Sequence, residues 1–201
     1  MRAIVIGTST IGNAVTEVFR EHGHEVVQAG RSSGEIRADL TDPESLRGLF
    51  SGQAGFDAVA VCAGEVFPAS LAEADDDQWA GSIASKGMGQ INVVRAGTPY
   101  LADAGSFTLV SGILGDEVGP TMTIGATVNR MVEGFVGAAA TELPRGIRIN
   151  CVSPAVLEES SAYHPYFPGF VPVPARDVAL AYLRAASNPY SGRIMALHRT
   201  G

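Results

Sequence analysis

The chain has 201 residues, a length that suits one α/β domain with a full hydrophobic core. Hydrophobic residues make up 46% of it and charged residues 17%, which excludes a disordered chain. The net charge is −7 and no run of Lys and Arg exceeds two residues, so no nucleic-acid partner is expected, because a phosphate backbone is bound by a basic face.

The sequence predicts neither a signal peptide nor a membrane partner. Only residues 3–6 form an apolar run before Gly7, and no later stretch is long enough to cross a bilayer. Cys62 and Cys151 lie inside apolar runs and are predicted to be buried free thiols in a reducing compartment. We therefore expect a cytoplasmic protein, and we predict no metal site.

Short apolar runs alternate with segments of helical period along the whole chain. In chain order we predict a strand at 3–6, a helix at 11–22, strands at 25–29 and 36–38, and a helix at 42–51 capped by Thr41 or Asp42. A strand at 58–62, a long helix at 76–101, a strand at 106–110, a helix from about 119 to 143, a strand at 148–152, a helix at 174–187 and a strand at 193–197 follow.

The predicted strands are rich in Val, Ile and Ala and lack polar alternation, as is typical of parallel strands buried on both faces. Strand–helix alternation with short connections predicts a doubly wound parallel α/β sheet of the Rossmann type. No shift in composition marks a second domain, so residues 1–201 are predicted to form a single domain.

A glycine-containing turn joins the first predicted strand to the first predicted helix. At such a turn, backbone N–H groups can approach a pyrophosphate at the helix N-terminus. Gly7 permits the tight turn, Gly12 lets the helix pack closely on the strand, and the hydroxyl side chains between them can donate to phosphate. Any tight turn could use two glycines, yet the position directly after an N-terminal strand favours a nucleotide site. The predicted loop residues are Gly7, Thr8, Ser9, Thr10, Ile11 and Gly12.

Several segments of the chain resemble those of the short-chain dehydrogenase/reductase family. The turn resembles the family's Gly-x-x-x-Gly-x-Gly loop, although it is one residue shorter and has Thr10 at the middle glycine. Cys62-Ala63-Gly64 resembles the family's Asn-Ala-Gly, and Asp39-Leu40-Thr41-Asp42 resembles its acidic segment near the adenine ring. Glu142-Leu143 with Gly146-Ile147-Arg148-Ile149-Asn150-Cys151-Val152-Ser153-Pro154 resembles the family's Glu-Leu…Gly-Ile-Arg-Val-Asn-x-Val-x-Pro-Gly stretch, with Ala155 replacing the last glycine.

The resemblance covers nearly the whole chain. It implies an oxidoreductase that acts on a small molecule with a nicotinamide cofactor, and a homo-oligomer, dimer or tetramer, associated through two long helices. The small residues Gly134, Gly137, Ala138, Ala139 and Ala140 fit such a helix contact. Beyond the loop, the cofactor-binding residues that the resemblance implies are Asp39, Leu40, Cys62, Ala63, Gly64 and Pro154.

The end of the second predicted strand favours NADP over NAD. An NAD-selective site places Asp or Glu there to accept from the ribose 2′-hydroxyl. Here the chain reads Gly30-Arg31-Ser32, and Arg31 attracts a 2′-phosphate to which Ser32 can donate. The alternative is that Arg31 is an ordinary solvent-facing arginine.

The family's catalytic Tyr-x-x-x-Lys pair has no match in this sequence. Counting back from Glu142-Leu143 puts Gly125 in the tyrosine slot and Asn129 in the lysine slot. Ser111 stands near the slot of the family's catalytic serine, although Gly112 competes for that alignment.

Lys86 or a residue of the predicted lid, Tyr163, Tyr166 or His164, could replace the missing acid. Lys86 recurs with Trp79, Ile83, Gln90, Val94 and Leu101 on one face of the long predicted helix, where a charge needs a partner or a cleft. Asn129 likewise points inward on the next helix, and Tyr163 lies in the 158–173 loop, the natural lid of the site. Their structural alternatives are a helix-edge lysine, an internal hydrogen bond and aromatic packing of the lid.

The sequence leaves two functions open, and a third possibility, loss of nucleotide binding, rests on the shortened loop. The first is an atypical NADP-dependent oxidoreductase of a small carbonyl or alcohol, in which Lys86, Ser111, Asn129 and Tyr163 are the catalytic candidates. The second is a degenerate NADP-binding protein that regulates or partners another, since loss of the general acid lowers the rate on the order of 10² to 10⁴.

Overall fold

The computed structural model describes residues 1–198, which form a seven-stranded parallel sheet with helices on both faces. The strands lie in the order β3-β2-β1-β4-β5-β6-β7, and every neighbouring pair is parallel. This confirms the predicted doubly wound Rossmann-type fold. The strands are β1 Arg2–Ile6, β2 Glu25–Gly30, β3 Ile36–Arg37, β4 Phe56–Val61, β5 Leu101–Val110, β6 Arg148–Pro154 and β7 Ile194–Leu197.

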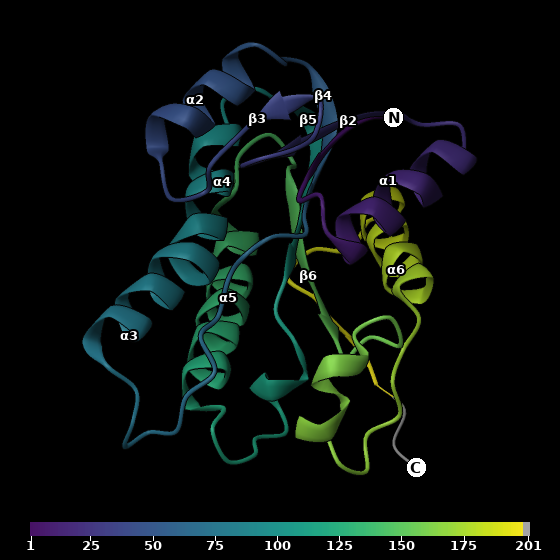
Figure 1. Ribbon diagram of the computed structural model, residues 1–201. Coiled ribbons are helices and arrows are strands. Elements are labelled where there is room, and N and C mark those ends of the chain that lie inside the picture. Colours follow the sequence, from purple (N-terminus) through teal and green to yellow (C-terminus); the bar gives the residue numbers. More distant parts are fainter. Residues whose placement is uncertain (199–201) are drawn as a thin grey trace.

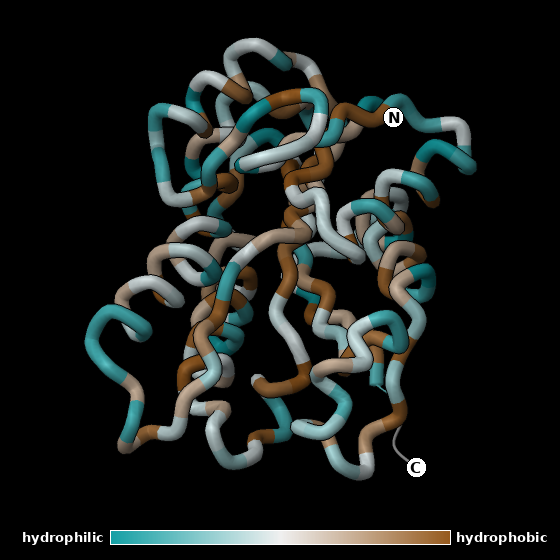
Figure 2. Tube along the Cα trace, viewed as in Figure 1, coloured by the Kyte–Doolittle hydropathy of each residue, from teal (hydrophilic) through white to brown (hydrophobic). Residues whose placement is uncertain are grey.

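The helices form one layer on each face of the sheet (Figure 1). The helices α1 (Thr10–Glu21) and α6 (Ala175–Ser187) pack together on one face. On the other lie α2 (Pro43–Ser51), α4 (Gly89–Gly97) and α5 (Thr123–Glu142). Hydrophobic segments run through the middle of the molecule and hydrophilic ones along the outer turns (Figure 2), so one buried core lies on each face of the sheet.

The strand order places a topological switch point between β1 and β4. From β1 the chain winds outward through β2 to β3, then crosses back to β4 and continues to β7. In open α/β sheets, ligands bind at this switch point, beyond the carboxyl ends of the strands. The segments that begin at Gly7 and Cys62 follow β1 and β4 and therefore meet there.

The predicted long helix at 76–101 is wrong in two respects. The chain instead forms α3 (Asp76–Ser82), then η1, a π-helical segment at Ile83–Met88, and then α4, which ends before Thr98-Pro99. Proline removes a backbone donor and clashes with the preceding turn, so the helix stops there. Leu101 already belongs to β5, which begins five residues earlier than predicted and contains an irregularity where Ala104 adopts a positive φ of 59°.

Other boundaries moved by a few residues. The helix expected from about 119 begins at Thr123, and α6 begins at Ala175 with Pro174 as its N-cap. The cap of α2 is Asp42, whose carboxylate accepts from Glu44 N, so the prediction of Thr41 or Asp42 is confirmed. Among residues 1–198, no helix is long and apolar enough to cross a membrane.

Candidate functional site

A cleft of about 310 Å³ opens at the switch point. Its walls come from the segments that follow β1, β2, β3 and β4. Ten of the predicted cofactor-binding residues line it: Gly7, Thr8, Ser9, Arg31, Ser32, Asp39, Leu40, Cys62, Ala63 and Gly64. The fold therefore brings residues from Gly7 to Gly64, which are far apart in the sequence, to the walls of one cavity.

Glycines shape this cleft through close backbone approaches. Gly7 has a φ of 133°, and a Cβ there would lie 2.9 Å from the Cys62 carbonyl oxygen. A Cβ on Gly12 would lie 2.1 Å from the Gly7 carbonyl oxygen, so α1 packs directly on the turn as the sequence predicts. Ser9 is the N-cap of α1, and its side chain makes no capping hydrogen bond. The first N–H groups of α1 are thus left for an anionic ligand.

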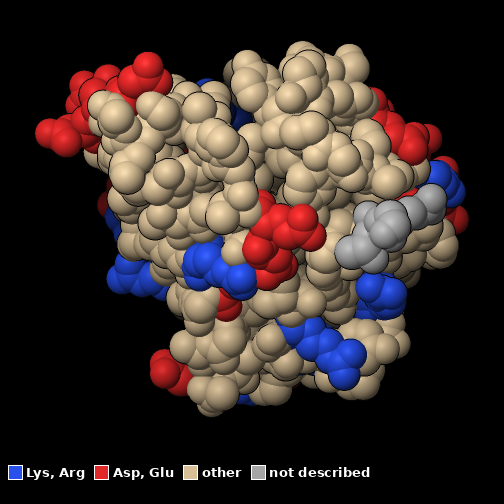
Figure 3. Space-filling view, turned by 90° about the horizontal axis from the view of Figure 1, so that it is seen from below, with Lys and Arg blue, Asp and Glu red and all other residues tan. Residues whose placement is uncertain are grey.

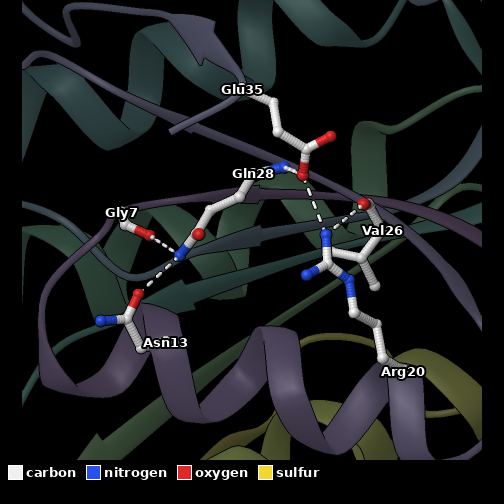
Figure 4. A network of polar contacts seen from close by, with 6 residues as sticks. All are labelled: Gly7, Asn13, Arg20, Val26, Gln28 and Glu35. Carbon is white, nitrogen blue, oxygen red and sulfur yellow. Dashed lines mark hydrogen bonds and ion pairs between the residues drawn. The ribbon is translucent and has the colours of Figure 1, made fainter. Parts of the chain in front are cut away.

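A glutamine on β2 holds the glycine turn in place (Figure 4). The Gln28 side-chain amide donates to the Gly7 carbonyl oxygen at 3.0 Å and to Asn13 Oδ1 at 3.0 Å. Glu35 accepts from Arg20 at 2.9 Å beside it, which ties α1 to the segment before β3. The glycine turn and the start of α1 are therefore fixed to β2 before any ligand arrives.

Two polar side chains of the cleft are already engaged. Asp39 accepts from the Thr41 backbone N–H at 2.8 Å and from its hydroxyl at 2.7 Å, and these bonds hold the pKa of the Asp39 carboxyl below its usual value. Thr8 Oγ1 accepts from the Ser33 hydroxyl at 2.6 Å, which leaves the Thr8 hydrogen free to donate.

Four of the predicted cofactor residues lie outside this cleft. Gly12 is buried against the turn, and Thr10 is exposed and lines a separate groove between α1 and α6. Ile11 and Pro154 line a second pocket instead. Thr10 is the first residue of α1, and its role in cofactor binding stays a prediction.

The second pocket measures about 350 Å³ and shares the wall of Ser9, Cys62, Ala63 and Gly64 with the first. All four predicted catalytic residues line it: Lys86, Ser111, Asn129 and Tyr163. The rest of its wall is mostly apolar, with Val110, Ile113, Leu114, Val156, Leu157 and Phe167. Two adjoining pockets of this kind suit a long cofactor in one and a small apolar substrate in the other.

Lys86 is the only lysine of the chain, and it stands in the π-helical segment η1. Its side chain is partly buried, and Nζ donates to the Ser111 carbonyl oxygen at 3.0 Å. Burial disfavours the charged amine and lowers the pKa of Lys86 to about 8. The Cys151 and Glu133 side chains oppose that shift more weakly. The missing side chain of Gly64 lets η1 pack closely against the segment after β4, since a Cβ on Gly64 would lie 2.9 Å from Lys86 Cα.

Ser111 and Asn129 bring buried oxygens to the same pocket. Ser111 Oγ and Asn129 Oδ1 are buried without a hydrogen-bond partner of standard geometry among the described residues. The Cys151 thiol lies beside Ser111, and burial raises the pKa of that thiol to about 12. Asn129 Nδ2 donates to the Gly112 carbonyl oxygen at 3.1 Å. A buried polar atom without a partner is unfavourable, so both oxygens suit a polar ligand group.

Comparison with known proteins agrees with this geometry. Residues 5–184 match the family model described as enoyl-(acyl carrier protein) reductase. The chain belongs to the short-chain dehydrogenase/reductase family. The protein lin1944 from Listeria innocua is 39% identical, with a TM-score of 0.94 over 98% of each chain.

Two further relatives show the same relationship. A small-chain dehydrogenase solved in complex with NADPH is 27% identical, with a TM-score of 0.87 over 98% of this chain and 96% of that one. An uncharacterized oxidoreductase of Staphylococcus aureus strain MW2 is 25% identical over 93% of this chain and 91% of its own length. The fold and the oxidoreductase family are thus established together.

The position that aligns with the family's tyrosine is closely packed. Gly125 is buried, and a Cβ there would lie 3.1 Å from Leu114 Cδ1 and 3.6 Å from Val66 Cγ1. Apolar side chains thus occupy the space that a larger residue would need. Tyr163 lines the same pocket from the 158–173 segment, with 58% of its surface exposed. That segment contains the short 3₁₀ helix η3, Ser161–Tyr166.

The face seen in Figure 3 is largely uncharged, with an acidic group beside a basic one near its centre. His164 Nε2 lies 2.9 Å from the Leu157 carbonyl oxygen, which ties the imidazole to the backbone of its own loop.

Three residues in or next to the two pockets were not among the predicted site residues. Gln90 is fully buried and hydrogen-bonds the last residue of β5, Val110. Glu133, four residues after Asn129 on α5, is buried and accepts from Arg130 at 2.9 Å. Glu65 lines the first cleft, 2.9 Å from Arg31. Helical phase placed Gln90 and Asn129 inward and could have found Glu133, whereas nothing local pairs Glu65 with Arg31.

Proposed function

We propose that this family member binds NADP and transfers reducing equivalents between it and a small carbonyl or alcohol. The observation that carries the proposal is the amine of Lys86, beside Ser111 in the pocket that continues the nucleotide cleft. The family and its oxidoreductase character are established, whereas the cofactor form and the residues that act belong to the proposal.

The residues of the first cleft fit a dinucleotide phosphate. The uncapped N-terminus of α1 and the turn at Gly7 offer backbone N–H groups to a pyrophosphate. Arg31 and Ser32 line the same cleft and would hold the adenine ribose of such a ligand, where Arg31 would favour a 2′-phosphate over a hydroxyl. The relative solved with NADPH supports the same cofactor form.

When bound, NADPH supplies the two electrons and one hydrogen of a carbonyl reduction. The protein must then give one proton to the carbonyl oxygen, on which negative charge develops. An ammonium group carries three hydrogens, and Lys86 uses one of them on the Ser111 carbonyl oxygen. The others serve a substrate oxygen, and solvent at the open mouth of the pocket restores the proton after the alcohol leaves.

The surroundings of Lys86 suit it to donate this proton. A pKa of about 8 makes the ammonium a better acid than a solvent-exposed lysine while it stays mostly protonated at neutral pH. Ser111 Oγ and Asn129 Oδ1 lie in the same pocket without partners and serve to orient the substrate. The apolar wall favours an apolar group next to the carbonyl.

The test has two stages. Calorimetric titration of the purified protein with NADPH and NADH measures binding, and we expect NADPH to bind about tenfold more tightly. Oxidation of NADPH over a panel of aldehydes and ketones then measures turnover, with Lys86→Met and Lys86→Arg compared to the wild type. We expect both variants to bind NADPH normally and to lose most turnover, on the order of 10² or more, because neither has an acid that titrates near neutral pH. Wild-type turnover in either variant would disprove the role of Lys86.

In a second candidate function, the protein binds the cofactor but catalyses no hydride transfer. The packing of Leu114 and Val66 over Gly125 and the exposure of Tyr163 favour it, because no tyrosine is enclosed in this pocket. In that case the protein binds NADPH as a regulatory or partner protein. NADPH binding without oxidation over the whole panel would support this second function.

A further inference from the structure

An ion pair spans the mouth of the nucleotide cleft. Arg31 follows β2 and Glu65 follows β4, and these strands lie on either side of β1. Arg31 Nη2 and Glu65 Oε1 are 2.9 Å apart, so the pair reaches across the glycine turn that follows β1. Both residues line the cleft, and their side chains are 64% and 60% exposed.

The backbone at Glu65 is fixed on the far side of the cleft. Its N–H donates to the Ser85 hydroxyl at 2.9 Å, and Gly64 before it holds a φ of 144° against Lys86. The Glu65 carboxylate is therefore presented to Arg31 by a rigid segment and can leave only by a change of its own side chain. Asp39, the other carboxylate near Arg31, is engaged by Thr41.

We propose that Glu65 is a specificity-determining residue that competes with the 2′-phosphate of the nucleotide for Arg31. The inference rests on the proposed function, in which Arg31 receives that phosphate. Glu65 already accepts from Arg31 Nη2 and offsets the charge of the guanidinium, so a 2′-phosphate must displace the carboxylate from Nη2 or bind the remaining N–H groups of a partly neutralised arginine. A nucleotide without that phosphate has no group that requires the ion pair to open. Glu65 thus narrows the preference for NADPH that Arg31 creates.

The experiment is calorimetric titration of the full chain with NADPH, NADH and 2′,5′-ADP. Glu65→Gln removes the competing charge and keeps the side-chain shape. We expect it to tighten NADPH and 2′,5′-ADP about fivefold and to leave NADH within about twofold of the wild type. The effect of the substitution should shrink with added salt, since the charges are exposed.

Glu21→Gln is the matched control. Glu21 accepts from Arg176 at 2.7 Å, is partly exposed, and does not line the nucleotide cleft. The control variant gains the same unit of charge, so an equal effect on NADPH would show a general charge effect and overturn the inference. In the background of Arg31→Met, the Glu65→Gln effect should shrink to the direct repulsion between carboxylate and phosphate, and an undiminished effect would also overturn the inference.

The two failures are distinguishable. A wild type that binds neither nucleotide contradicts the proposed function, and the inference about Glu65 falls with it. A wild type that binds NADPH, with an unchanged ratio of NADPH to NADH affinity in Glu65→Gln, overturns the inference alone.

Discussion

Gln90 and Val110 exchange two hydrogen bonds in the interior of the protein. Gln90 Nε2 donates to the Val110 carbonyl oxygen at 2.8 Å, and Gln90 Oε1 accepts from the Val110 N–H at 2.8 Å. The same amide group donates to the Lys86 carbonyl oxygen at 3.1 Å. One fully buried side chain thus joins η1 to the carboxyl end of β5, where Ser111 begins the second pocket.

We predict that Gln90→Leu strongly destabilises the protein. Leucine fills a similar space but leaves two groups of Val110 and the Lys86 carbonyl oxygen without their partner. A loss of roughly 2–4 kcal/mol in the free energy of unfolding is expected, measured by urea denaturation. Asn92→Leu on the same helix is the control, since Asn92 accepts only from Arg95 in an exposed pair. Equal stabilities for the two variants would contradict the prediction.

The pKa of Lys86 can be measured directly, because the chain has one lysine. Protein labelled with ¹³C at the lysine side chain should give one lysine signal, and we expect it to titrate near pH 8. A titration above pH 10 would show that burial does not act on this amine.

The lowered pKa also predicts how stability depends on pH. Between about pH 8 and 10.5 the unfolded chain binds the lysine proton and the folded chain does not, so this group increases stability as pH rises. Below pH 8 the folded protein must bury the charge. Lys86→Met should therefore be more stable than the wild type at pH 7, and the difference should shrink as pH rises from 8 to 10.5. Thermal unfolding across this range checks the prediction, and a constant difference would refute it.

Turnover should follow the same titration. In the direction of carbonyl reduction the acid must be protonated, so we expect kcat to fall as pH rises through about 8. In the direction of alcohol oxidation kcat should rise over the same range. Profiles that do not change sign with the direction of the reaction would assign the pH dependence to another group.

Substitution by alanine should change the stability of the protein in opposite directions at two glycines. Gly64 has a positive φ of 144°, and an added Cβ would lie 2.9 Å from Lys86 Cα, so Gly64→Ala should destabilise by about 1–3 kcal/mol. Gly48 lies within α2 with nothing within 4 Å of an added Cβ, so Gly48→Ala should stabilise by about 0.5–1 kcal/mol. Urea denaturation of both variants tests this contrast.

Self-association through α5 remains a prediction, and the structure leaves room for it. Gly134, Gly137 and Ala138 are exposed on this helix, and a Cβ on either glycine would meet nothing within 4 Å. Light scattering should give a particle of at least twice the 20.9 kDa chain mass. Ala138→Arg should reduce it to the monomer, and a wild-type monomer at micromolar concentration would exclude the association.

The fold was predictable because its signals are local. Apolar runs without polar alternation are typical of buried parallel strands. Asp42 before Pro43 marks a helix start, because the Asp42 carboxylate can cap the first N–H groups and the proline ring fits the first helical position. The break at η1 was not predictable, since Ile83 to Met88 continues the helical period of its neighbours. Helical phase placed Lys86 and Gln90 inward, but it wrongly placed Ile83, which is exposed.

The sequence predicted which residues line the site, but it did not predict which of them contact one another. Motif spacing indicated Gly7, Cys62 and Arg31, and the sheet brought them to one cleft. The contacts of Arg31 with Glu65 and of Lys86 with Ser111 depend on which strands become neighbours, and no local pattern encodes them. Motif spacing also grouped Thr10 with these residues, whereas the structure places it in a separate groove between α1 and α6.

The wider turn of η1 has a consequence for how this chain aligns with its relatives. Ser82 and Ser85 both accept hydrogen bonds from the segment after β4, from Phe67 N at 3.1 Å and Glu65 N at 2.9 Å. Each residue of an α-helix turns by about 100°, so deletion of Ala84 would rotate Ser82 away from Phe67 while Gln90 still held the following turn. A relative that is one residue shorter here would therefore keep the fourth residue before the glutamine where Lys86 stands and present a different side chain where Ser82 stands, so an alignment of this helix should start from the buried glutamine.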